Sequence, residues 1–188
     1  MRGFIAINLP EAERQRIHDV ARPLRTAELP IRWVEPAAYH VTLAFLGDVA
    51  PAAIRPIEAA ILEATAGVSR FPLELGRLEL VPTPRRPRVF WLEVAVSPEL
   101  KGLHNGLLRT LREAGFALED RAFRPHLTLG RVRRSARPTD FASLPERTAA
   151  LDFAGTSIVA SVDLMQSKLS TKAARYSVVS KTPLDRPH

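Results

Sequence analysis

The tetrad His40-Val41-Thr42-Leu43 occurs a second time, nearly unchanged, as His126-Leu127-Thr128-Leu129. Apolar and β-branched residues surround both copies, which is typical of β-strands. Because residues two apart in a strand point to the same face, the histidine and threonine of each tetrad share one face, whereas Val41 and Leu127 point the other way, into a core. The sequence therefore predicts that each of the two tetrads presents an imidazole beside a hydroxyl on one face of its strand.

Strands and helices are expected to alternate along the chain. Apolar residues at three-and-four spacing predict helices at residues 11–25, 51–66 and 98–114, the last one capped by Ser97 and ended by Gly115. Apolar runs and alternating patterns predict strands at residues 3–9, 31–34, 39–46, 71–81, 89–96, 123–129, 150–153, 157–166 and 176–181, with loops at 82–87 and 133–140.

Several of the expected strands follow one another through short loops. This favours an α+β fold with antiparallel sheets over a doubly wound parallel sheet. The two tetrads also occupy corresponding places in two similar halves of the chain, each running strand, helix, strand. We therefore expect residues 1–188 to form a single domain of two similar lobes, produced by internal duplication, with the tetrads facing each other across one cleft.

Composition limits the classes of protein that the chain can belong to. It has 188 residues, 46% of them hydrophobic, and no cysteine, so a substantial core is expected while disulfides, thiolate nucleophiles and cysteine-ligated metals are excluded. The first apolar run is too short for a signal peptide, and no stretch reaches the ~18 residues that a membrane span needs. A soluble, cytoplasmic protein is expected, with a monomer as the default.

Arginine supplies most of the formal net charge of +7. The planar guanidinium fork suits phosphate, and a basic surface attracts polyanions, so a nucleic-acid or nucleotide partner is favoured. A general bias towards arginine would equally place arginines on every part of the surface, without a specific partner. The role of each arginine cluster is therefore left open. The two clusters are Arg85, Arg86 and Arg88, and Arg131, Arg133, Arg134 and Arg137.

Two imidazoles on opposite sides of a substrate can act as acid and base, because histidine both donates and accepts protons near neutral pH. Phosphodiester cleavage needs such a pair together with donors to the non-bridging oxygens, which Thr42 and Thr128 can supply. A metal site is disfavoured, because neither tetrad has a carboxylate or second histidine in register. The sequence also has no glycine-rich phosphate loop or adenylation lysine motif.

The remaining candidate side chains have simpler interpretations. Glu35 and Asp48 could orient an imidazole, but a loop acid and a turn acid are the simpler interpretations. Aromatic side chains near the tetrads are expected in the core more often than as platforms for bases, and the other histidines as surface or packing residues. These are Trp33, Phe45 and Trp91, and His18, His104 and His188.

With those residues in place, the sequence closely resembles the two-histidine (2H) phosphoesterases, and within them the bacterial and archaeal RNA 2′,3′-cyclic phosphodiesterases, historically called 2′-5′ RNA ligases. The likeness spans nearly the whole chain. Beyond the tetrads it includes Arg2–Ile7, Arg32–Val34, Leu46-Gly47, Arg88–Leu92, Phe123–Arg131 and Leu164–Leu169 with Tyr176.

The resemblance implies a bilobal α+β fold with pseudo-twofold symmetry, in which antiparallel sheets from two intertwined lobes line a central cleft and helices lie outside. It implies hydrolysis of RNA 2′,3′-cyclic phosphate ends to 2′-phosphate ends without metal or cofactor, with tRNA fragments as candidate substrates. His40 would donate a proton to the leaving 3′ oxygen, and His126 would be the base that activates water. Thr42, Thr128 and Arg131 would hold the phosphate.

Three other functions are compatible with the same residues. The first is 2′-5′ RNA ligation, in which the cyclic phosphate is the energy source. The second is a non-catalytic module that binds RNA ends, in which the tetrads hold the terminal phosphate and the arginines hold the strand. The third keeps the chemistry and changes the substrate to a small cyclic nucleotide or an ADP-ribose cyclic phosphate.

Overall fold

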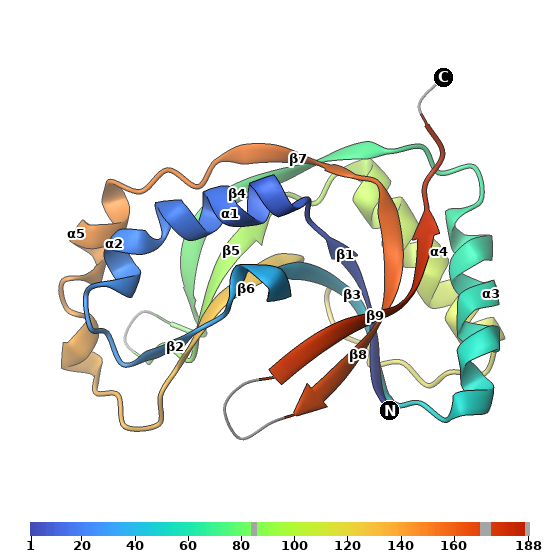
Figure 1. The fold of residues 1–188 in the computed structure, drawn as a ribbon, viewed down its shortest axis with the longest axis horizontal. Helices are drawn as coiled ribbons and strands as arrows, with labels where there is room; N and C mark the ends of the chain where they lie inside the picture. Colours follow the sequence, from blue (N-terminus) through green and yellow to red (C-terminus); the bar gives the residue numbers. More distant parts are fainter. Residues whose placement is uncertain (84–85, 170–173, 187–188) are drawn as a thin grey trace.

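In the computed structural model, residues 1–83, 86–169 and 174–186 are described. Their strands form one curled antiparallel sheet of nine strands, and helices lie along both sides of the molecule (Figure 1). The predicted α+β fold with antiparallel strands is confirmed.

The bounds of the elements follow the chain order. The helices are α1 (Glu11–Val20), α2 (Arg22–Arg25), α3 (Ile54–Thr65), α4 (Pro98–Glu113) and α5 (Leu144–Ala149). The strands are β1 (Arg2–Asn8), β2 (Ile31–Trp33), β3 (His40–Asp48), β4 (Phe71–Val81), β5 (Val89–Val94), β6 (His126–Val132), β7 (Gly155–Val159), β8 (Ser161–Leu169) and β9 (Ala174–Pro183).

The two tetrad strands, β3 and β6, are neighbours at the centre of the sheet. The strand order is β7-β4-β5-β6-β3-β1-β8-β9, and β2 pairs with the far end of β6. β3 and β6 meet at one residue pair, Val41 opposite Leu127, and both of these side chains are fully buried. The pairing of the two tetrads therefore joins the two halves of the sheet.

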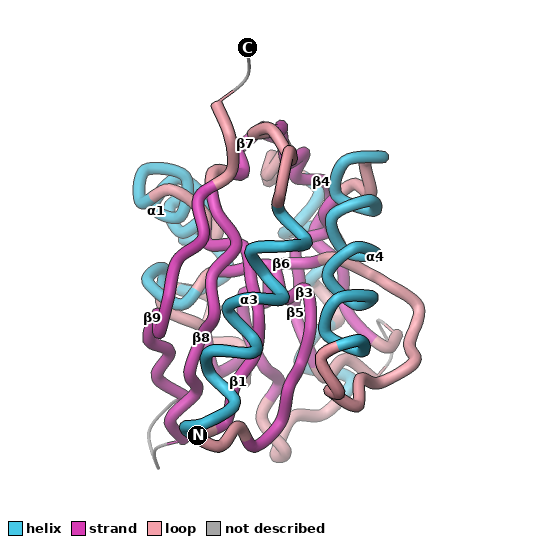
Figure 2. The backbone as a smooth tube through the Cα atoms, turned by 90° about the vertical axis from the view of Figure 1, so that its right-hand side faces the viewer, coloured by secondary structure: helices cyan, strands magenta, loops and turns pink. Residues whose placement is uncertain are grey.

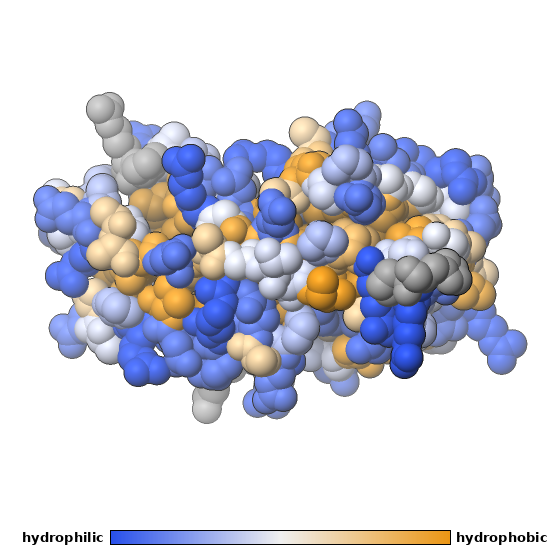
Figure 3. All heavy atoms as spheres, turned by 90° about the horizontal axis from the view of Figure 1, so that it is seen from above, coloured by the Kyte–Doolittle hydropathy of each residue, from blue (hydrophilic) through white to orange (hydrophobic). Residues whose placement is uncertain are grey.

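The helices and the sheet enclose one large hydrophobic core. α3 and α4 pack against each other, and α3 also contacts β8 and β9, as Figure 2 shows. α1 lies over the other half, where the Arg16 guanidinium donates to the carbonyl oxygen of Phe153 at 3.2 Å. Seen from above, hydrophilic residues dominate the surface, and hydrophobic residues show between them on both halves (Figure 3).

Local signals in the sequence place α4 correctly. The Ser97 hydroxyl accepts a hydrogen bond from the Leu100 backbone N–H at 3.1 Å, which is the expected N-cap. Gly115 has φ of +88°, a left-handed conformation that glycine adopts at little cost, and it ends the helix as predicted. Ser97 and Gly115 thus fix both ends of α4.

Three local predictions are wrong, and one helix was missed. The helix expected at residues 11–25 is broken at Ala21 into α1 and α2, because Pro23 has no N–H to continue the hydrogen-bond ladder. Residues 150–153 are not a strand, although the Phe153 side chain is buried in the core. The strand expected at 157–166 is two strands separated at Ala160, since β7 pairs with β4 and β8 pairs with β1 and β9. α5 was not predicted.

Substitution by alanine is expected to change the free energy of unfolding in opposite directions at two glycines. An added Cβ at Gly130 in β6 would lie 2.6 Å from Ile31 Cγ2 and 3.2 Å from the Trp33 ring, so we expect Gly130→Ala to destabilise the fold by about 1–3 kcal/mol. At Gly102 in α4 nothing lies within 4 Å, and Gly102→Ala is expected to stabilise by about 0.5–1 kcal/mol. Denaturant titration measures both free energies of unfolding, and equal effects would contradict the close packing of β2 on Gly130.

Candidate active site

Both tetrads begin their strands, β3 at His40 and β6 at His126. Over seven residues the two strands have the same pattern of buried and half-buried side chains, with each histidine and threonine half-buried. An antiparallel pair centred on Val41 and Leu127 sets His40 across from Thr128, and Thr42 across from His126. The structure thus places two imidazoles and two hydroxyls on one face of the sheet, which we call the cleft face.

The two imidazoles are oriented in the same way. His40 Nδ1 lies 2.7 Å from the carbonyl oxygen of Ala38, and His126 Nδ1 lies 2.7 Å from that of Arg124. A carbonyl oxygen only accepts, so in each ring Nδ1 carries the proton and Nε2 is the nitrogen left for chemistry. In both cases the carbonyl belongs to the residue two positions earlier.

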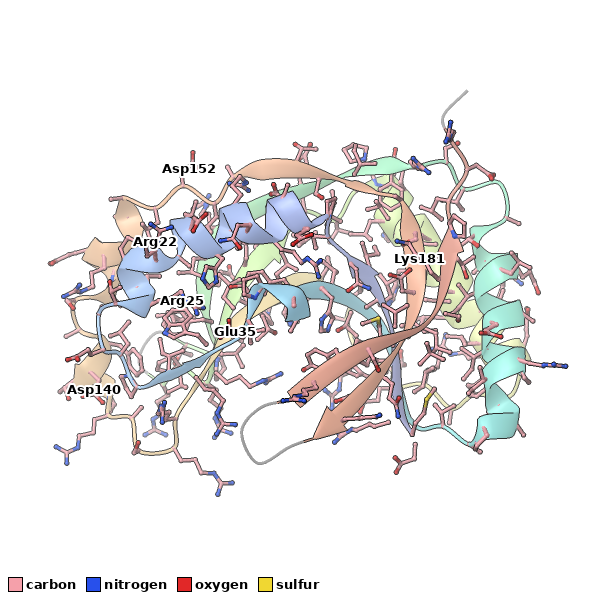
Figure 4. The ribbon with its side chains drawn as sticks, in the orientation of Figure 1. Arg22, Arg25, Glu35, Asp140, Asp152 and Lys181 are labelled. Carbon is pink, nitrogen blue, oxygen red and sulfur yellow. The ribbon has the colours of Figure 1, made fainter. Side chains whose placement is uncertain are left out.

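Backbone carbonyl oxygens therefore orient the two imidazoles, a role that the sequence analysis considered for the carboxylates of Glu35 and Asp48. Glu35 lies beside Arg25, with 3.7 Å between its carboxylate oxygen and the guanidinium (Figure 4). Asp48 is at the other end of β3, opposite Arg2. Neither acid has a hydrogen bond to His40 or His126 among the contacts of the described residues.

Aromatic rings support both histidines. The His40 ring lies 4.9 Å from that of Phe4 and 5.0 Å from that of Tyr176, measured between centroids. The His126 ring lies 4.1 Å from Trp91. Trp91 is half-buried on the cleft face, so its predicted place in the core is wrong.

The ring of Trp91 is itself held in place by charged neighbours. Its indole N–H donates to Glu79 Oε2 at 2.8 Å. The Arg124 guanidinium lies over the ring, 4.8 Å from the centroid, and 3.6 Å from the same Glu79 oxygen. Sequence reasoning missed this support, because Glu79 lies on β4 and its proximity depends on the register between β4 and β5.

Burial lowers the pKa of both His40 and His126 below the ordinary histidine value, and the hydrogen bonds to Ala38 and Arg124 carbonyls oppose that shift. Nearby positive charge lowers both pKa values further. The positive charge of Arg131 contributes to the lowering at both imidazoles. Both histidines are therefore expected to be mainly neutral at pH 7.

A β-bulge places Arg131 on the cleft face. Strict alternation would turn Arg131 towards the core, because it lies an odd number of positions after His126. The pairing of β6 with β5 skips Leu129, and this extra residue resets the alternation. Arg131 is consequently exposed on the same face as His126 and Thr128.

β3 has the corresponding bulge at Leu43, where its pairing with β1 skips one residue. The position that matches Arg131 is Phe45, and the Phe45 side chain is 65% exposed. The prediction that Phe45 lies in the core is therefore wrong. Trp33 is half-buried and packs on Phe90, with 5.7 Å between ring centroids, as a core residue would.

A buried carboxylate that the sequence did not reveal lies near β3. The Asn8 side-chain amide donates to Asp163 Oδ2 at 2.7 Å, and Asn8 is the β1 residue opposite His40. Asp163 is 1% exposed. Alternation from Phe4 through Ala6 to Asn8 could have indicated that Asn8 faces the cleft, whereas the approach of Asp163 depends on strand pairing.

The other histidines lie elsewhere. His104 is buried in α4 and stacks on Phe123 at 3.8 Å, and His18 is in α1. His188 is outside the described residues. Within the described ranges no group of three or more His, Cys, Asp or Glu side chains is placed to hold a metal ion. The described helices are also too short or too polar to cross a membrane.

Comparison with known proteins gives consistent matches. The family model described as LigT like phosphoesterase matches the chain twice, at residues 7–91 and 92–176. The protein named RNA 2′,3′-cyclic phosphodiesterase from Methanothermobacter thermautotrophicus is 30% identical over 94% of this chain and 95% of its own length. The protein of the same name from Archaeoglobus fulgidus is 31% identical over 94% and 96%.

Solved structures agree with these matches. The crystal structure of TT0787 of Thermus thermophilus has a TM-score of 0.81 at 25% identity and covers 100% of both chains. That of E. coli LigT complexed with 3′-AMP has a TM-score of 0.70 at 26% identity and covers 98% of both. The resemblance seen in the sequence and the expectation of an enzyme are confirmed. The chain, matched over almost its entire length, belongs to the LigT-like phosphoesterase family.

Proposed function

We propose that the protein hydrolyses RNA 2′,3′-cyclic phosphate ends to 2′-phosphate ends by paired-histidine acid and base catalysis, without a metal ion. Relatives named RNA 2′,3′-cyclic phosphodiesterase support hydrolysis of a cyclic phosphate. The observation that carries the finer proposal is the pair of imidazoles on adjacent strands, each with Nδ1 bonded to a backbone carbonyl and Nε2 available.

In this proposal His126 removes a proton from water as its oxygen attacks phosphorus. The bond between phosphorus and the 3′ oxygen breaks, and His40 donates a proton to that oxygen, which leaves the phosphate on the 2′ oxygen. Burial and the charges of Arg124 and Arg131 lower the pKa of His126, which favours the neutral form that a base requires.

The remaining site residues stabilise the phosphate. The Thr42 and Thr128 hydroxyls share the cleft face with the histidines and can donate to the non-bridging oxygens, where negative charge accumulates. Arg131 adds a charged donor on the same face. The donor set suits proton transfer better than metal binding, because a catalytic zinc ion usually takes three protein ligands.

The proposed architecture is one domain, residues 1–188, made of two similar intertwined lobes that each contribute one tetrad. Two successive matches of one family model support an internal duplication, as does the equal burial pattern of β3 and β6. RNA is the proposed partner. The predicted monomer and the tRNA fragments stay predictions.

A small nucleotide is the second candidate substrate. The E. coli relative has been crystallised with 3′-AMP, so a single nucleotide binds to that protein. The substrate test therefore includes a mononucleoside 2′,3′-cyclic phosphate beside the RNA.

The first test incubates the purified protein with a short RNA that ends in a 2′,3′-cyclic phosphate, in excess chelator, and determines the position of the product phosphate. We expect turnover to a 2′-phosphate end that the chelator does not slow. RNA that is bound and never cleaved would replace the proposal with the RNA-end-binding module, and a joined product would favour 2′-5′ ligation.

His40→Ala and His126→Ala are each expected to lower kcat by about 10²- to 10⁴-fold, because each removes one proton-transfer group. His18→Ala in α1 is the matched control and is expected to keep full activity. Circular dichroism checks that all three variants are folded. Full turnover in either cleft variant would refute the acid and base assignment.

The pH profile of kcat/KM tests the electrostatics. The free enzyme must hold His40 protonated and His126 neutral, and both pKa values lie below the ordinary value, so the optimum is expected on the acidic side of pH 6.5. Arg131→Gln removes a charge that lowers both pKa values, so the profile should move to higher pH. The variant should also have a kcat/KM about 10- to 100-fold lower, because it cannot make the charged hydrogen bond to phosphate. An unmoved profile would contradict the action of the Arg131 charge on both histidines.

A further inference from the structure

Arg32 lies directly opposite Arg131 in the antiparallel pair of β2 with β6. Residues opposite each other in such a pair have their side chains on the same face, with Cβ atoms ~5 Å apart. Two arginine side chains thus leave the sheet side by side, although like charges at such positions repel each other. Sequence patterns alone assign no role to Arg32.

The shared face is the cleft face. Ile31 and Trp33, which flank Arg32 in β2, turn towards the core and lie on either side of Gly130. Arg32 must therefore point the other way, as does Arg131. Both arginines are exposed.

A third arginine continues the row. The ladder between β6 and β2 extends one step past both strands, because the Arg133 N–H donates to the Pro30 carbonyl oxygen at 2.8 Å. Residues two apart share a face, so Arg133 follows Arg131 on the cleft side. We call Arg131, Arg32 and Arg133 the arginine row. β2 runs beside the end of β6 that is farthest from its first residue, His126, so the row lies at that end of the strand (Figure 1).

The arginine row has no acidic counterpart in the part of the chain that the structure describes, since none of its three members takes part in an ion pair there. Several other arginines on the surface are paired with acids, whereas others, such as Arg55, have no ion pair among the described residues. The pairs are Arg16 with Glu13, Arg22 with Asp19, Arg109 with Glu113, Arg121 with Glu119 and Arg124 with Glu79. Adjacent cations without carboxylates form a site for an anion with more than one charge.

We propose that the arginine row binds the RNA backbone on the 5′ side of the reacting end, with Arg32 on the phosphate next to the cyclic one. This inference rests on the proposed function and extends it. A cyclic phosphate occupies the 3′ end of an RNA, so the rest of the strand continues only in the 5′ direction. Arg131 lies on the same face as both histidines, and Arg32 lies beside it on the neighbouring strand, one strand spacing (~5 Å) away.

The proposal makes Arg32 a determinant of substrate length. A mononucleoside 2′,3′-cyclic phosphate has no further phosphate for Arg32 to bind, whereas an oligonucleotide has one. Arg32→Gln should therefore weaken the use of the oligonucleotide alone. The chemical step takes place at the histidines and should keep its kcat.

The experiment compares Arg32→Gln with the wild type on cytidine 2′,3′-cyclic phosphate and on a hexanucleotide with the same end. We expect KM for the hexanucleotide to rise about 10-fold, the effect of removing one charged hydrogen bond, with KM for the mononucleotide and both kcat values unchanged. The dependence of log KM on log salt for the hexanucleotide should become shallower by about 0.7, because the variant binds one phosphate fewer.

Arg55→Gln is the matched control, because it removes the same charge from an exposed position on α3, outside the cleft face. It is expected to change neither KM. A rise in KM of equal size for both substrates, or no rise for the hexanucleotide, would overturn the proposal. A melting temperature below that of the wild type would reveal a folding defect, in which case Arg133→Gln, which lies outside β2 and β6, decides by the same two KM values.

Binding separates failure of this proposal from failure of the proposed function. If the wild type cleaves neither substrate, the hydrolysis proposal falls, and fluorescence anisotropy with a hexanucleotide that ends in a 2′-phosphate still tests Arg32. Weaker binding by Arg32→Gln, with a shallower dependence of log affinity on log salt, would support RNA binding by the arginine row. Equal binding by Arg32→Gln, Arg55→Gln and the wild type would overturn it.

Discussion

The contact between Val41 and Leu127 determines where everything else in the cleft lies. These fully buried side chains form the one residue pair through which β3 and β6 meet, and each lies between the histidine and the threonine of its tetrad. Burying them on one face obliges the four polar side chains to share the other, because strand side chains alternate. The site is thus fixed by hydrophobic burial on the opposite side of the sheet. No polar contact between the two tetrads is needed to bring them together.

A second constraint, the matching bulges at Leu43 and Leu129, gives the cleft two chemically different sides. Each bulge resets the alternation of its strand and exposes the residue five positions after the histidine. In β6 that residue is Arg131, and in β3 it is Phe45. The backbone repeats almost unchanged while the side chains diverge, so one side of the cleft presents a cation and the other an aromatic ring. A substrate with a charged part and an apolar part has one favourable orientation in such a cleft.

Several features that depend on local pattern could be predicted from the sequence. Alternation placed Val41 and Leu127 in the core, the Ser97 and Gly115 signals bounded α4, and the doubled tetrad located the candidate site. Features that depend on pairing between distant strands could not be predicted. The core position expected for Phe45 and Trp91 assumed regular alternation and ordinary burial, whereas the bulge in β3 exposes Phe45 and the register of β5 sets Trp91 against His126. For the same reason, the sequence did not predict that Arg32 lies opposite Arg131. The two residues are 99 positions apart in sequence and adjacent in the sheet.

The charges around the histidines have a consequence for the order of events. Burial and Arg131 lower the pKa of both imidazoles, which suits a base and opposes an acid. A phosphate bound against Arg131 would bring negative charge between the rings, offset the arginine charge and raise both pKa values. An imidazole that is neutral before the substrate binds would then hold a proton more readily once the substrate is present. In the proposed mechanism, proton donation by His40 would in this way be coupled to occupancy of the cleft, because the bound anion would supply the charge that the proposed acid requires.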